Sequence, residues 1–479
     1  MTQPAWVGKV REIVGRENLL DAPEDLVTHS YDGTPMLEKL PVAVAIPRST
    51  EDVSRILKLA NEAPFNVVPR GAGSGLSGGS VPVENSLVLL MTRWNRILEI
   101  DEKNLAAWAE PGVITAQFHK AVEARGLFYP PDPSSMNVCT LGGNVAENSG
   151  GLRCLKYGMT KPYVLGLEAV LPTGDVVKCG GKVTKDVAGY DLKDWFVGSE
   201  GSLGVFTKIL LKLVPKPETS RTLLAWYPRL VDCAETVSAL IAAKITPSIL
   251  EFLDRTTIRC VEDYAKIGLP TDLEAILLLE ADGRAPVVEE DARRAEEICR
   301  RGGASFVKVA KDEAEAMQLK QARRGAFSAL ARVRPTTVLE DVTVPRSEIA
   351  PMVVKIQEIA KKNDVVFGNF GHAGDGNLHP TCLIDERIPD EVHRAEKAFD
   401  EIFNLAIDMG GTITGEHGTG LAKKKFLPRQ FGEAGVEMMR RIKSVLDPNG
   451  ILNPGKIFNP KPRCEGSLPK TREQAALIP

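Results

Sequence analysis

The sequence has 479 residues, of which 43% are hydrophobic and 26% are charged, so its length predicts two or three domains and its composition an ordinary globular protein. A net charge of −3 excludes the strongly basic balance of proteins that bind nucleic acids or anionic membrane surfaces. The eight cysteines include no CxxC pair, which excludes iron–sulfur and tetrahedral zinc sites built from local thiolates and favours reduced cysteines in a cytoplasmic protein.

The first part of the chain alternates helix and strand patterns. No secretory signal is expected at its start, and no apolar run approaches the roughly 20 residues of a membrane-spanning helix. Apolar residues at helical spacing cover residues 50–63, with Thr50 as the possible N-cap. The other predicted elements are strands at 65–69, 86–91 and 204–214, a helix at 115–126 and a hairpin at 164–179. Pro-Lys-Pro at 215–217 marks a first domain boundary.

The second part of the chain mixes long helices with strands. Helices are predicted at 287–301, 312–333, 394–409 and 436–445, and strands at 249–253, 275–279, 306–310, 338–344 and 365–370. This order predicts an α+β domain with an antiparallel sheet. The run Lys423-Lys424-Lys425 is interpreted as a solvated helix start, with a docking patch as the alternative, and the polar tail after Phe458 is expected to run over the surface.

The segment PRGAGSGLSGG (69–79) is a candidate phosphate cradle, because successive glycines let backbone N–H groups converge on one anion. A P-loop is excluded because no lysine follows, and a Rossmann fingerprint is excluded because the spacing differs and no helix begins after it. Taken alone, the segment could also be a flexible surface loop. Further glycine segments follow at 140–144, 148–151, 198–204 and 453–456, and one long, flat ligand such as a dinucleotide would explain them all.

Five motifs resemble a known family when they are taken together and in order. They are PRGAGSGLSGG, PPDPSS (130–135), TLGGNVAENSGG (140–151), GSEGSLGVFT (198–207) and LDPNGILNPGKIF (446–458). They are similar to the FAD-linked oxidases with the vanillyl-alcohol oxidase/p-cresol methylhydroxylase fold. Within that family the resemblance is to the D-2-hydroxy-acid dehydrogenase branch, and most of all to the D subunit of glycolate oxidase and the FAD-dependent D-lactate dehydrogenases. The resemblance covers residues 10–458.

The resemblance implies an α+β fold with an FAD-binding domain of two subdomains at 1–217. A substrate or cap domain with an antiparallel sheet would follow at 218–420. A C-terminal helical segment at 421–458 would return to close the FAD site, and 459–479 would be the surface tail.

The resemblance also implies which residues hold FAD. The pyrophosphate would be wrapped by Pro69, Arg70, Gly71, Ala72, Gly73, Ser74, Gly75, Gly78 and Gly79. The flavin would be lined by Pro131, Asp132, Thr140, Gly142, Gly143, Asn148, Gly150 and Gly151. Glu200, Gly201 and Val205 would hold the adenosine half, and Asn453 would close the site. Some relatives bind FAD covalently through a histidine near these loops. Residues 69–79 contain none and His119 lies in a predicted helix, so noncovalent FAD is expected.

GHAGDGNLHP (371–380) carries His372 and His379 on either side of the turn signal Asp375-Gly376. A strand, a tight turn and a returning strand could place the two imidazoles side by side, and a carboxylate follows at Glu416. Two histidines and one carboxylate with open positions suit Zn²⁺, Mn²⁺ or Fe²⁺. Hydrogen-bonding histidines in a tight turn are the alternative. The resemblance supports the metal, because the matching residues of this branch bind a divalent metal beside the flavin.

The reaction implied by the resemblance is oxidation of a small D-2-hydroxy acid, D-lactate or glycolate, to the 2-oxo acid, with hydride transfer from Cα to flavin N5. Coordination to a cation lowers the pKa of the substrate hydroxyl, and His417 is the natural general base because imidazole titrates near neutral pH. Adjacent residues on an extended segment point to opposite sides, so Glu416 and His417 need a local distortion to face one site.

Arg323 matches the arginine that binds the substrate carboxylate in the family, with Arg324 as the neighbour it could be confused with, and Asn377 is expected to contact the substrate. Relatives with a dicarboxylic substrate carry a lysine near position 339. This chain has Val338-Leu339-Glu340-Asp341 there, which favours a small monocarboxylic acid.

Without iron–sulfur cysteines of its own, the chain must pass its electrons to another carrier. The resemblance suggests an iron–sulfur subunit or an electron-transfer flavoprotein, and peripheral membrane association only through such a partner. Two alternatives stay open: a flavin-dependent non-redox enzyme like alkyl-dihydroxyacetone-phosphate synthase, and a noncatalytic flavoprotein subunit.

Overall fold

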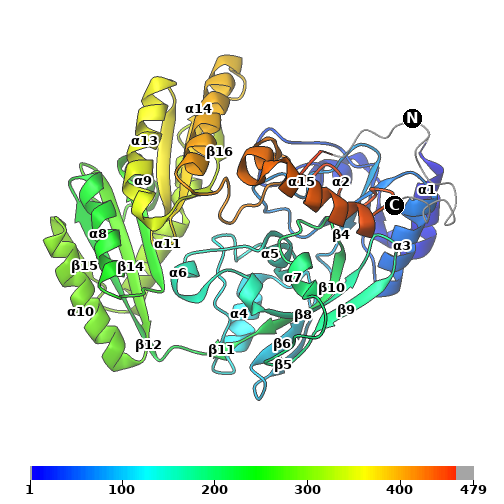
Figure 1. Ribbon diagram of the computed structural model, residues 1–479, viewed down its shortest axis with the longest axis horizontal. Coiled ribbons are helices and arrows are strands. Elements are labelled where there is room, and N and C mark those ends of the chain that lie inside the picture. Colours follow the sequence, from blue (N-terminus) through cyan, green and yellow to red (C-terminus); the bar gives the residue numbers. More distant parts are fainter. Residues whose placement is uncertain (1–2, 460–479) are drawn as a thin grey trace.

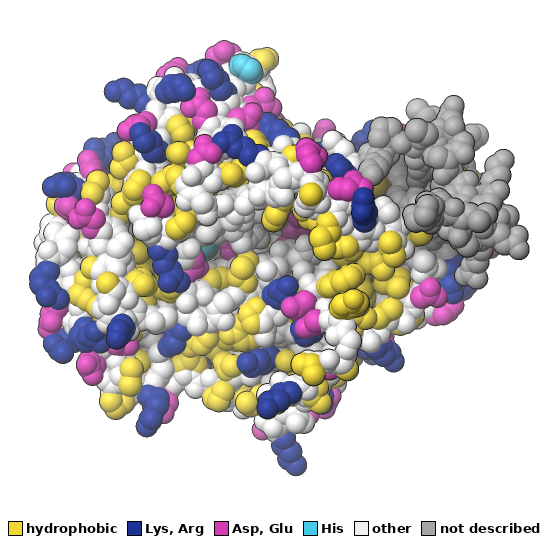
Figure 2. Space-filling model, viewed as in Figure 1, with side chains coloured by type: hydrophobic (Ala, Val, Ile, Leu, Met, Phe, Trp, Pro, Cys, Tyr) yellow, Lys and Arg dark blue, Asp and Glu magenta, His cyan; other side chains and the backbone are white. Residues whose placement is uncertain are grey.

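The computed structural model describes residues 3–459 and has two parts that lie beside each other (Figure 1). The chain before residue 217 forms the first part, and an eight-stranded sheet with its helices forms the second. The space-filling view shows the same face hollowed between the two parts (Figure 2). Apart from its first residue, the predicted tail at 459–479 lies outside the described residues. Among the described residues, no helix is long and apolar enough to cross a bilayer.

A mixed four-stranded sheet in the order β1–β2–β4–β3 begins the first part, and its last three strands run parallel. Apolar residues of α1 and α3 pack against it in one core. Ser49, and not the predicted Thr50, caps α3, because its Oγ accepts the N–H of Asp52 at 3.1 Å. The elements are α1 (Ala5–Val14), β1 (Leu19–Leu20), α2 (Pro23–Thr28), β2 (Ala43–Ala45), α3 (Thr50–Glu62), β3 (Asn66–Arg70) and β4 (Ser86–Leu90).

An antiparallel five-stranded sheet in the order β5–β6–β10–β8–β9 completes the first part. Phe118 of α4 and Val145 of α5 pack in its core. The predicted hairpin at 164–179 is the pair β8–β9. The elements are β5 (Ile97–Asp101), β6 (Ala106–Ala109), α4 (Thr115–Glu123), β7 (Leu127–Phe128), α5 (Leu141–Glu147), α6 (Cys154–Tyr157), β8 (Val164–Val170), β9 (Val176–Gly180), α7 (Leu192–Phe196), β10 (Val205–Lys212) and β11 (Val214–Pro215).

The second part is built on an antiparallel sheet in the order β15–β12–β14–β13–β18–β19–β16, with β17 also paired to β19. Its strands are β12 (Thr219–Tyr227), β13 (Ile249–Asp254), β14 (Ala275–Gly283), β15 (Phe306–Val309), β16 (Thr336–Leu339), β17 (Val342–Thr343), β18 (Val366–His372) and β19 (Asn377–Ile384). Its helices are α8 (Leu230–Ala242), α9 (Arg255–Ala265), α10 (Ala285–Arg301), α11 (Glu313–Arg324), α12 (Ala326–Leu330), α13 (Ile349–Lys362) and α14 (Pro389–Asp408).

The two faces of this sheet have different neighbours. Apolar residues of α8, α10, α13 and α14 pack against one face in the largest core of the protein. Apolar residues of α9, α11 and α12 pack on the other face, together with Leu152 from the first part. That second face therefore looks toward the hollow and positions the site.

The helix predicted over 312–333 is wrong in one respect, because it is two helices that meet at Gly325. The break lets α12 pack against α9 while α11 ends at the hollow with Arg323 and Arg324. In the second part, the sequence did not predict β12, α8, α9 and α13.

The C-terminal segment ties the two parts together. Helix α15 (Leu427–Leu446) begins in the core of the second part through Leu427, and Gly432 interrupts it with a φ of 69°. After the helix, Leu452 pairs with Val67 beside β3 and packs in the first core.

Candidate active site

A cavity of about 520 Å³ lies between the two parts. Its walls come from segments far apart in the sequence: the glycine loop after β3, the start of α5, the loop before β10, the end of α11 and the face of the second sheet on which α9, α11 and α12 pack. The cavity is in the usual size range for small-molecule and cofactor sites.

Glycines let separate segments of the chain approach one another closely at the cavity wall. A Cβ on Gly71 would lie 2.4 Å from Thr140 Oγ1, and a Cβ on Gly142 would lie 2.6 Å from Pro111 Cβ. By contrast, a Cβ on Gly75 would meet no protein atom closer than 4.0 Å, and one on Gly143 none closer than 3.4 Å, so both positions open into the cavity. Backbone therefore faces the space directly, as a dinucleotide cradle requires.

Most residues predicted to bind FAD line this cavity. They are Pro69, Arg70, Gly71, Ala72, Gly73, Ser74, Gly75, Gly79, Thr140, Gly142, Gly143, Gly150, Glu200, Gly201 and Val205. Thr140 also caps α5, because its Oγ1 accepts the N–H of Gly143 at 3.3 Å. Arg70 is buried at the entrance of the glycine loop.

The other predicted FAD residues, Gly78, Pro131, Asp132, Asn148, Gly151 and Asn453, are not part of the cavity wall. Two of them make hydrogen bonds to residues that line the cavity. Asp132 is buried and accepts a hydrogen bond from Arg324 Nη2 at 2.6 Å. Asn453 Nδ2 donates to the carbonyls of Gly79 at 3.0 Å and of Glu200 at 2.8 Å, so it joins two glycine-bearing loops.

The histidine motif is a β-hairpin, as its turn signal predicts. β18 ends at His372 and β19 begins at Asn377, with Gly376 at a φ of 81° in the turn. The imidazole centroids of His372 and His379 lie 5.0 Å apart. Phe370 pairs with His379 and His372 pairs with Asn377, so the strand alternation places all of these side chains on one face of the sheet.

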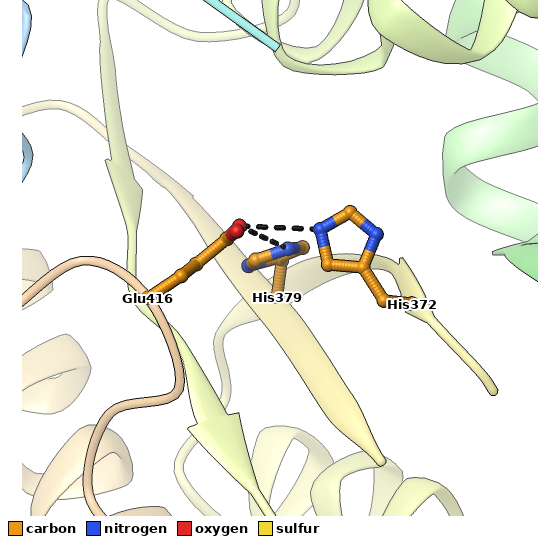
Figure 3. A group of neighbouring side chains, drawn as sticks. All are labelled: His372, His379 and Glu416. Carbon is orange, nitrogen blue, oxygen red and sulfur yellow. Dashed lines mark hydrogen bonds and ion pairs between the residues drawn. The ribbon is translucent and has the colours of Figure 1, made fainter. Parts of the chain in front are cut away.

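Glu416 completes a cluster with the two histidines (Figure 3). Its Oε1 lies 3.2 Å from His372 Nε2 and 3.3 Å from His379 Nε2. The three potential ligand atoms lie within 4.8 Å of one another, and no other such group of three or more occurs among the described residues. Two imidazole nitrogens and one carboxylate fit a catalytic divalent metal, because they leave coordination positions open.

Glu416 and the two histidines of this cluster shift one another's pKa values. Burial opposes the ionisation of Glu416, but the charge of His372 and hydrogen bonds from both imidazoles outweigh it and hold the pKa of the carboxyl well below its usual value. Burial likewise disfavours protonated His372, yet the charges of Glu251 and Glu416 raise its pKa well above the usual value. For His379, burial dominates and lowers the pKa.

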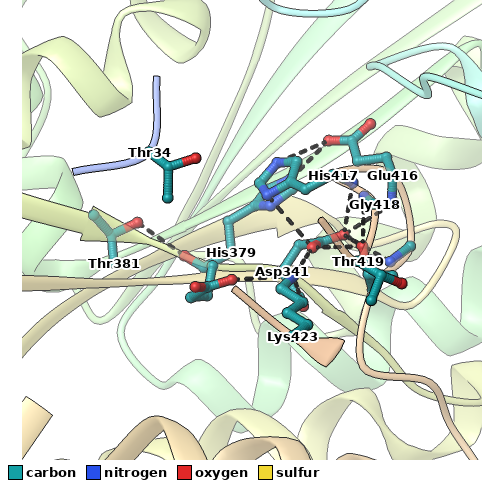
Figure 4. Close-up of polar contacts among 12 residues, drawn as sticks. Thr34, Asp341, His379, Thr381, Glu416, His417, Gly418, Thr419 and Lys423 are labelled. Atoms are coloured by element: carbon teal, nitrogen blue, oxygen red, sulfur yellow. Dashed lines mark hydrogen bonds and ion pairs between the residues drawn. The ribbon is translucent and has the colours of Figure 1, made fainter. Parts of the chain in front are cut away.

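Asp341 explains how the adjacent residues Glu416 and His417 reach one site (Figure 4). Its Oδ2 accepts the backbone N–H groups of Gly415 at 2.6 Å, of Glu416 at 2.8 Å and of His417 at 3.4 Å. Thr414 Oγ1 donates to Oδ1 at 2.9 Å. Consecutive N–H groups that converge on one carboxylate curl the chain, so the segment is not extended and both side chains line the cavity.

Register also decides where Asp341 lies. Leu339 pairs with Thr381 and Val342 with Leu378, so Asp341 lies opposite His379 on the same face of the sheet. A mutual backbone pair between Thr343 and Thr412 then brings the segment carrying Glu416 to the edge of this sheet.

His417 stacks on His379, with ring centroids 5.1 Å apart and an angle of 13° between the planes. Burial lowers the pKa of His417 to about 4, although Asp341 opposes the shift, so its imidazole is neutral at neutral pH. A neutral imidazole at the cavity wall has a nitrogen that can accept a proton.

Two arginines from the end of α11 face the cavity. Arg323 is buried, its guanidinium lies 4.7 Å from the centroid of the Phe370 ring, and its Nη2 lies 2.5 Å from Glu251 Oε2. Arg324 is more exposed and has one nitrogen, Nη1, without a hydrogen-bond partner. The predicted substrate contact Asn377 is buried beside Gly415 and is not part of the cavity wall.

The interpretation of the lysine run as a solvated helix start is wrong for Lys423. This side chain is fully buried, and its Nζ contacts the Asp341 carboxylate and lies 3.1 Å from Glu340 Oε2. Burial of Lys423 compensates the charges of two buried carboxylates, which would be destabilising without a cation beside them. Lys425 has no such buried partner and remains exposed.

Sequence reasoning missed the roles of the buried carboxylates Glu251 and Asp341, and of Glu147, whose Oε2 is buried. Glu147 lines the cavity, and burial raises the pKa of its carboxyl well above the usual value. A signal was present for Glu251, because an acid in the middle of the apolar strand ILEFLD is rarely buried without a partner.

Comparisons with known proteins agree with this architecture. Residues 41–180 match a family described as FAD binding domain, and residues 216–457 match FAD linked oxidases, C-terminal domain. Glycolate oxidase subunit GlcD of Bacillus subtilis is 55% identical over 447 residues, which cover 93% of this chain and 95% of that protein. D-lactate dehydrogenase of Anaerostipes hadrus is 36% identical and covers 95% of this chain and 97% of its own length.

Two solved structures show the fold alone. p-Cresol methylhydroxylase has a TM-score of 0.79 at 19% identity, over 95% of this chain and 96% of that one. Alkyldihydroxyacetonephosphate synthase has a TM-score of 0.75 at 18% identity, over 95% of this chain and 86% of that one. The family resemblance and the α+β fold of p-cresol methylhydroxylase type are confirmed, and the chain belongs to the FAD-linked oxidases as an FAD-dependent oxidoreductase.

Proposed function

We propose that this enzyme oxidises a small D-2-hydroxy acid, D-lactate or glycolate, to the corresponding 2-oxo acid. One observation carries the proposal: the group His372, His379 and Glu416 reaches, through His379 and Glu416, the same cavity as the glycine cradle and Arg323. The names of the relatives, glycolate oxidase subunit and D-lactate dehydrogenase, support this substrate class.

The chemistry needs two groups that the residues fit. Bound FAD would accept the hydride of the substrate Cα, and a divalent Zn, Mn or Fe ion on His372, His379 and Glu416 would acidify the substrate hydroxyl. We propose that FAD is held without a covalent bond. His119 supports this view, because it is buried in α4, bonds to the carbonyl of Pro131 at 2.9 Å and is not part of the cavity wall.

The residues of the chain have separate tasks in this proposal. Arg323, with Arg324 beside it, binds the substrate carboxylate and so orients the hydroxyl carbon. His417 takes the hydroxyl proton. Leu339 and Phe370 make the wall next to these groups apolar, which favours a short acid without a second carboxylate. Asn377 would act from behind the wall, through its contact with the Gly415 backbone.

We further propose that residues 1–217 bind FAD, that 218–420 form the substrate domain, and that 421–458 close the FAD site. The electrons would leave through an iron–sulfur subunit or an electron-transfer flavoprotein in the cytoplasm. The word "subunit" in the name of the relatives supports a partner protein.

A panel of D- and L-2-hydroxy acids tests the proposal. Purified protein is assayed with an artificial dye acceptor, before and after treatment with a chelator, and the visible flavin absorbance is followed under anaerobic conditions. We expect D-lactate or glycolate to bleach the flavin, and we expect chelation to abolish turnover until Zn²⁺, Mn²⁺ or Fe²⁺ is restored. A flavin that no 2-hydroxy acid reduces would contradict the proposed reaction, and turnover indifferent to chelation would contradict the metal.

A further inference from the structure

Glu251 lies beneath the site and touches both of its halves. It projects from β13 on the face of the sheet that carries the histidines, because it is the direct cross-strand neighbour of His372. Its side chain is fully buried. Oε1 lies 2.5 Å from His372 Nδ1, and Oε2 lies 2.5 Å from Arg323 Nη2.

On the metal side, Glu251 settles the orientation of an imidazole. A carboxylate that accepts a hydrogen bond from Nδ1–H leaves Nε2 as the free ligand nitrogen, and it holds the ring in one plane. His372 Nε2 is the atom that faces Glu416 at 3.2 Å. The contact with Glu251 therefore selects the nitrogen that the ligand cluster needs.

On the substrate side, Glu251 places a guanidinium. The ion pair holds one end of Arg323 at the sheet, and the ring of Phe370 supports its plane at 4.7 Å. Among the described residues, Glu251 is the only acidic group recorded in an ion pair with Arg323. The position of Arg323 at the cavity wall thus depends on this carboxylate.

We propose that Glu251 is a positioning residue that couples the metal ligands to the substrate carboxylate site. The same carboxylate contacts both side chains. A replacement that can make only one of the two contacts therefore leaves either His372 or Arg323 without its partner. The inference rests on the proposed function, because it assigns the metal to His372 and the substrate carboxylate to Arg323.

Glu251→Gln is the direct test, since an amide keeps one acceptor oxygen for His372 Nδ1–H but has no charge to pair with Arg323. Glu280→Gln is the matched control. Glu280 is a buried acid on the neighbouring strand β14, and it pairs with Lys320 of the same helix α11 at 2.5 Å, away from the cavity. Glu251→Asp is the second variant, because it keeps the charge but is too short to reach both partners.

Two dissociation constants are measured on the FAD-loaded, full-length protein. Zn²⁺ is titrated against a chromophoric chelator, and 2-hydroxyisobutyrate, which lacks a Cα hydrogen, is titrated on metal-free protein by its effect on the flavin spectrum. Loss of this kind of supporting contact weakens metal binding by about 10- to 100-fold. We expect Glu251→Gln to weaken both ligands by about that factor, Glu251→Asp to weaken at least one, and Glu280→Gln to leave both constants near the wild-type values.

The outcomes separate the two ideas. If wild-type protein binds neither Zn²⁺ nor 2-hydroxyisobutyrate, the proposed function fails and this inference fails with it. If wild type binds both and the two Glu251 variants bind both equally well, the proposed function stands and the role of Glu251 is refuted. Equal losses in Glu280→Gln would also refute it, since they would report a general loosening of the sheet. Should Glu251→Gln not fold, the constants of Glu251→Asp decide.

Discussion

Replacing Lys423 with methionine removes a buried cation while keeping a chain of similar length. The ammonium lies between Asp341 and Glu340, both buried, and 5.3 Å from the centroid of the Phe403 ring. Breaking a buried ion pair from one side is destabilising by about 3–5 kcal/mol. We expect the low end of that range, near 3 kcal/mol, because Asp341 keeps the N–H donors of residues 415–417.

The pH dependence of this loss has a defined sign. In the variant Glu340 has no cation, and burial already raises the pKa of its carboxyl above the usual value of 4.5. A carboxyl whose folded pKa is raised favours the folded state at low pH, and that contribution is lost as pH rises from the unfolded pKa toward the folded one. The loss of unfolding free energy caused by Lys423→Met, relative to the wild type, should therefore be larger at about pH 8 than at about pH 5.

Urea unfolding, followed by intrinsic fluorescence, measures both effects. Lys425→Met is the matched control from the same run, because its side chain is 58% exposed and pairs with Asp400 at the surface. Exposed pairs contribute about 1 kcal/mol or less. A free energy of unfolding for Lys423→Met within about 1 kcal/mol of the Lys425→Met value would refute the assignment of a buried, energetically coupled cation.

Three further predictions follow from the same geometry. Burial, with a smaller contribution from Arg153, lowers the pKa of His119 from 6.5 to about 4. The folded state therefore favours the neutral imidazole, and the free energy of unfolding should fall by about 2 kcal/mol as the pH is lowered from about 7.5 to about 5. His119→Gln should lack that loss in urea titrations at the two pH values, and an unchanged loss would contradict this origin. Gly150→Ala should weaken Zn²⁺ binding while flavin absorbance is retained, because the new Cβ would lie 2.4 Å from Glu416 Oε2. Gly143→Ala is the control and should leave Zn²⁺ binding unchanged, because the nearest protein atom to its Cβ is 3.4 Å away. Equal effects of the two substitutions on Zn²⁺ binding would contradict this reason. His379→Ala should abolish chelator-sensitive turnover in the dye assay, and a variant with wild-type turnover would return the histidines to a structural role.

The sequence determined the local parts of this protein. The glycine segments predicted a cradle because backbone can approach a ligand only where no Cβ intervenes, and the structure places most of them at one cavity. The turn between His372 and His379 predicted a hairpin with adjacent imidazoles, and the centroids lie 5.0 Å apart. These features depend on residues that are near one another in the chain, so pattern and turn chemistry are sufficient to find them.

Only the tertiary structure decided which groups support the site. Glu251 meets His372 because β13 pairs with β18, and Asp341 meets His379 because β16 and β17 pair with β19. Lys423 is buried for the same reason, since its partners Glu340 and Asp341 lie between β16 and β17, far from it in the sequence. Strand register across long loops and the burial of compensating charges are non-local, and no periodicity in the sequence encodes them.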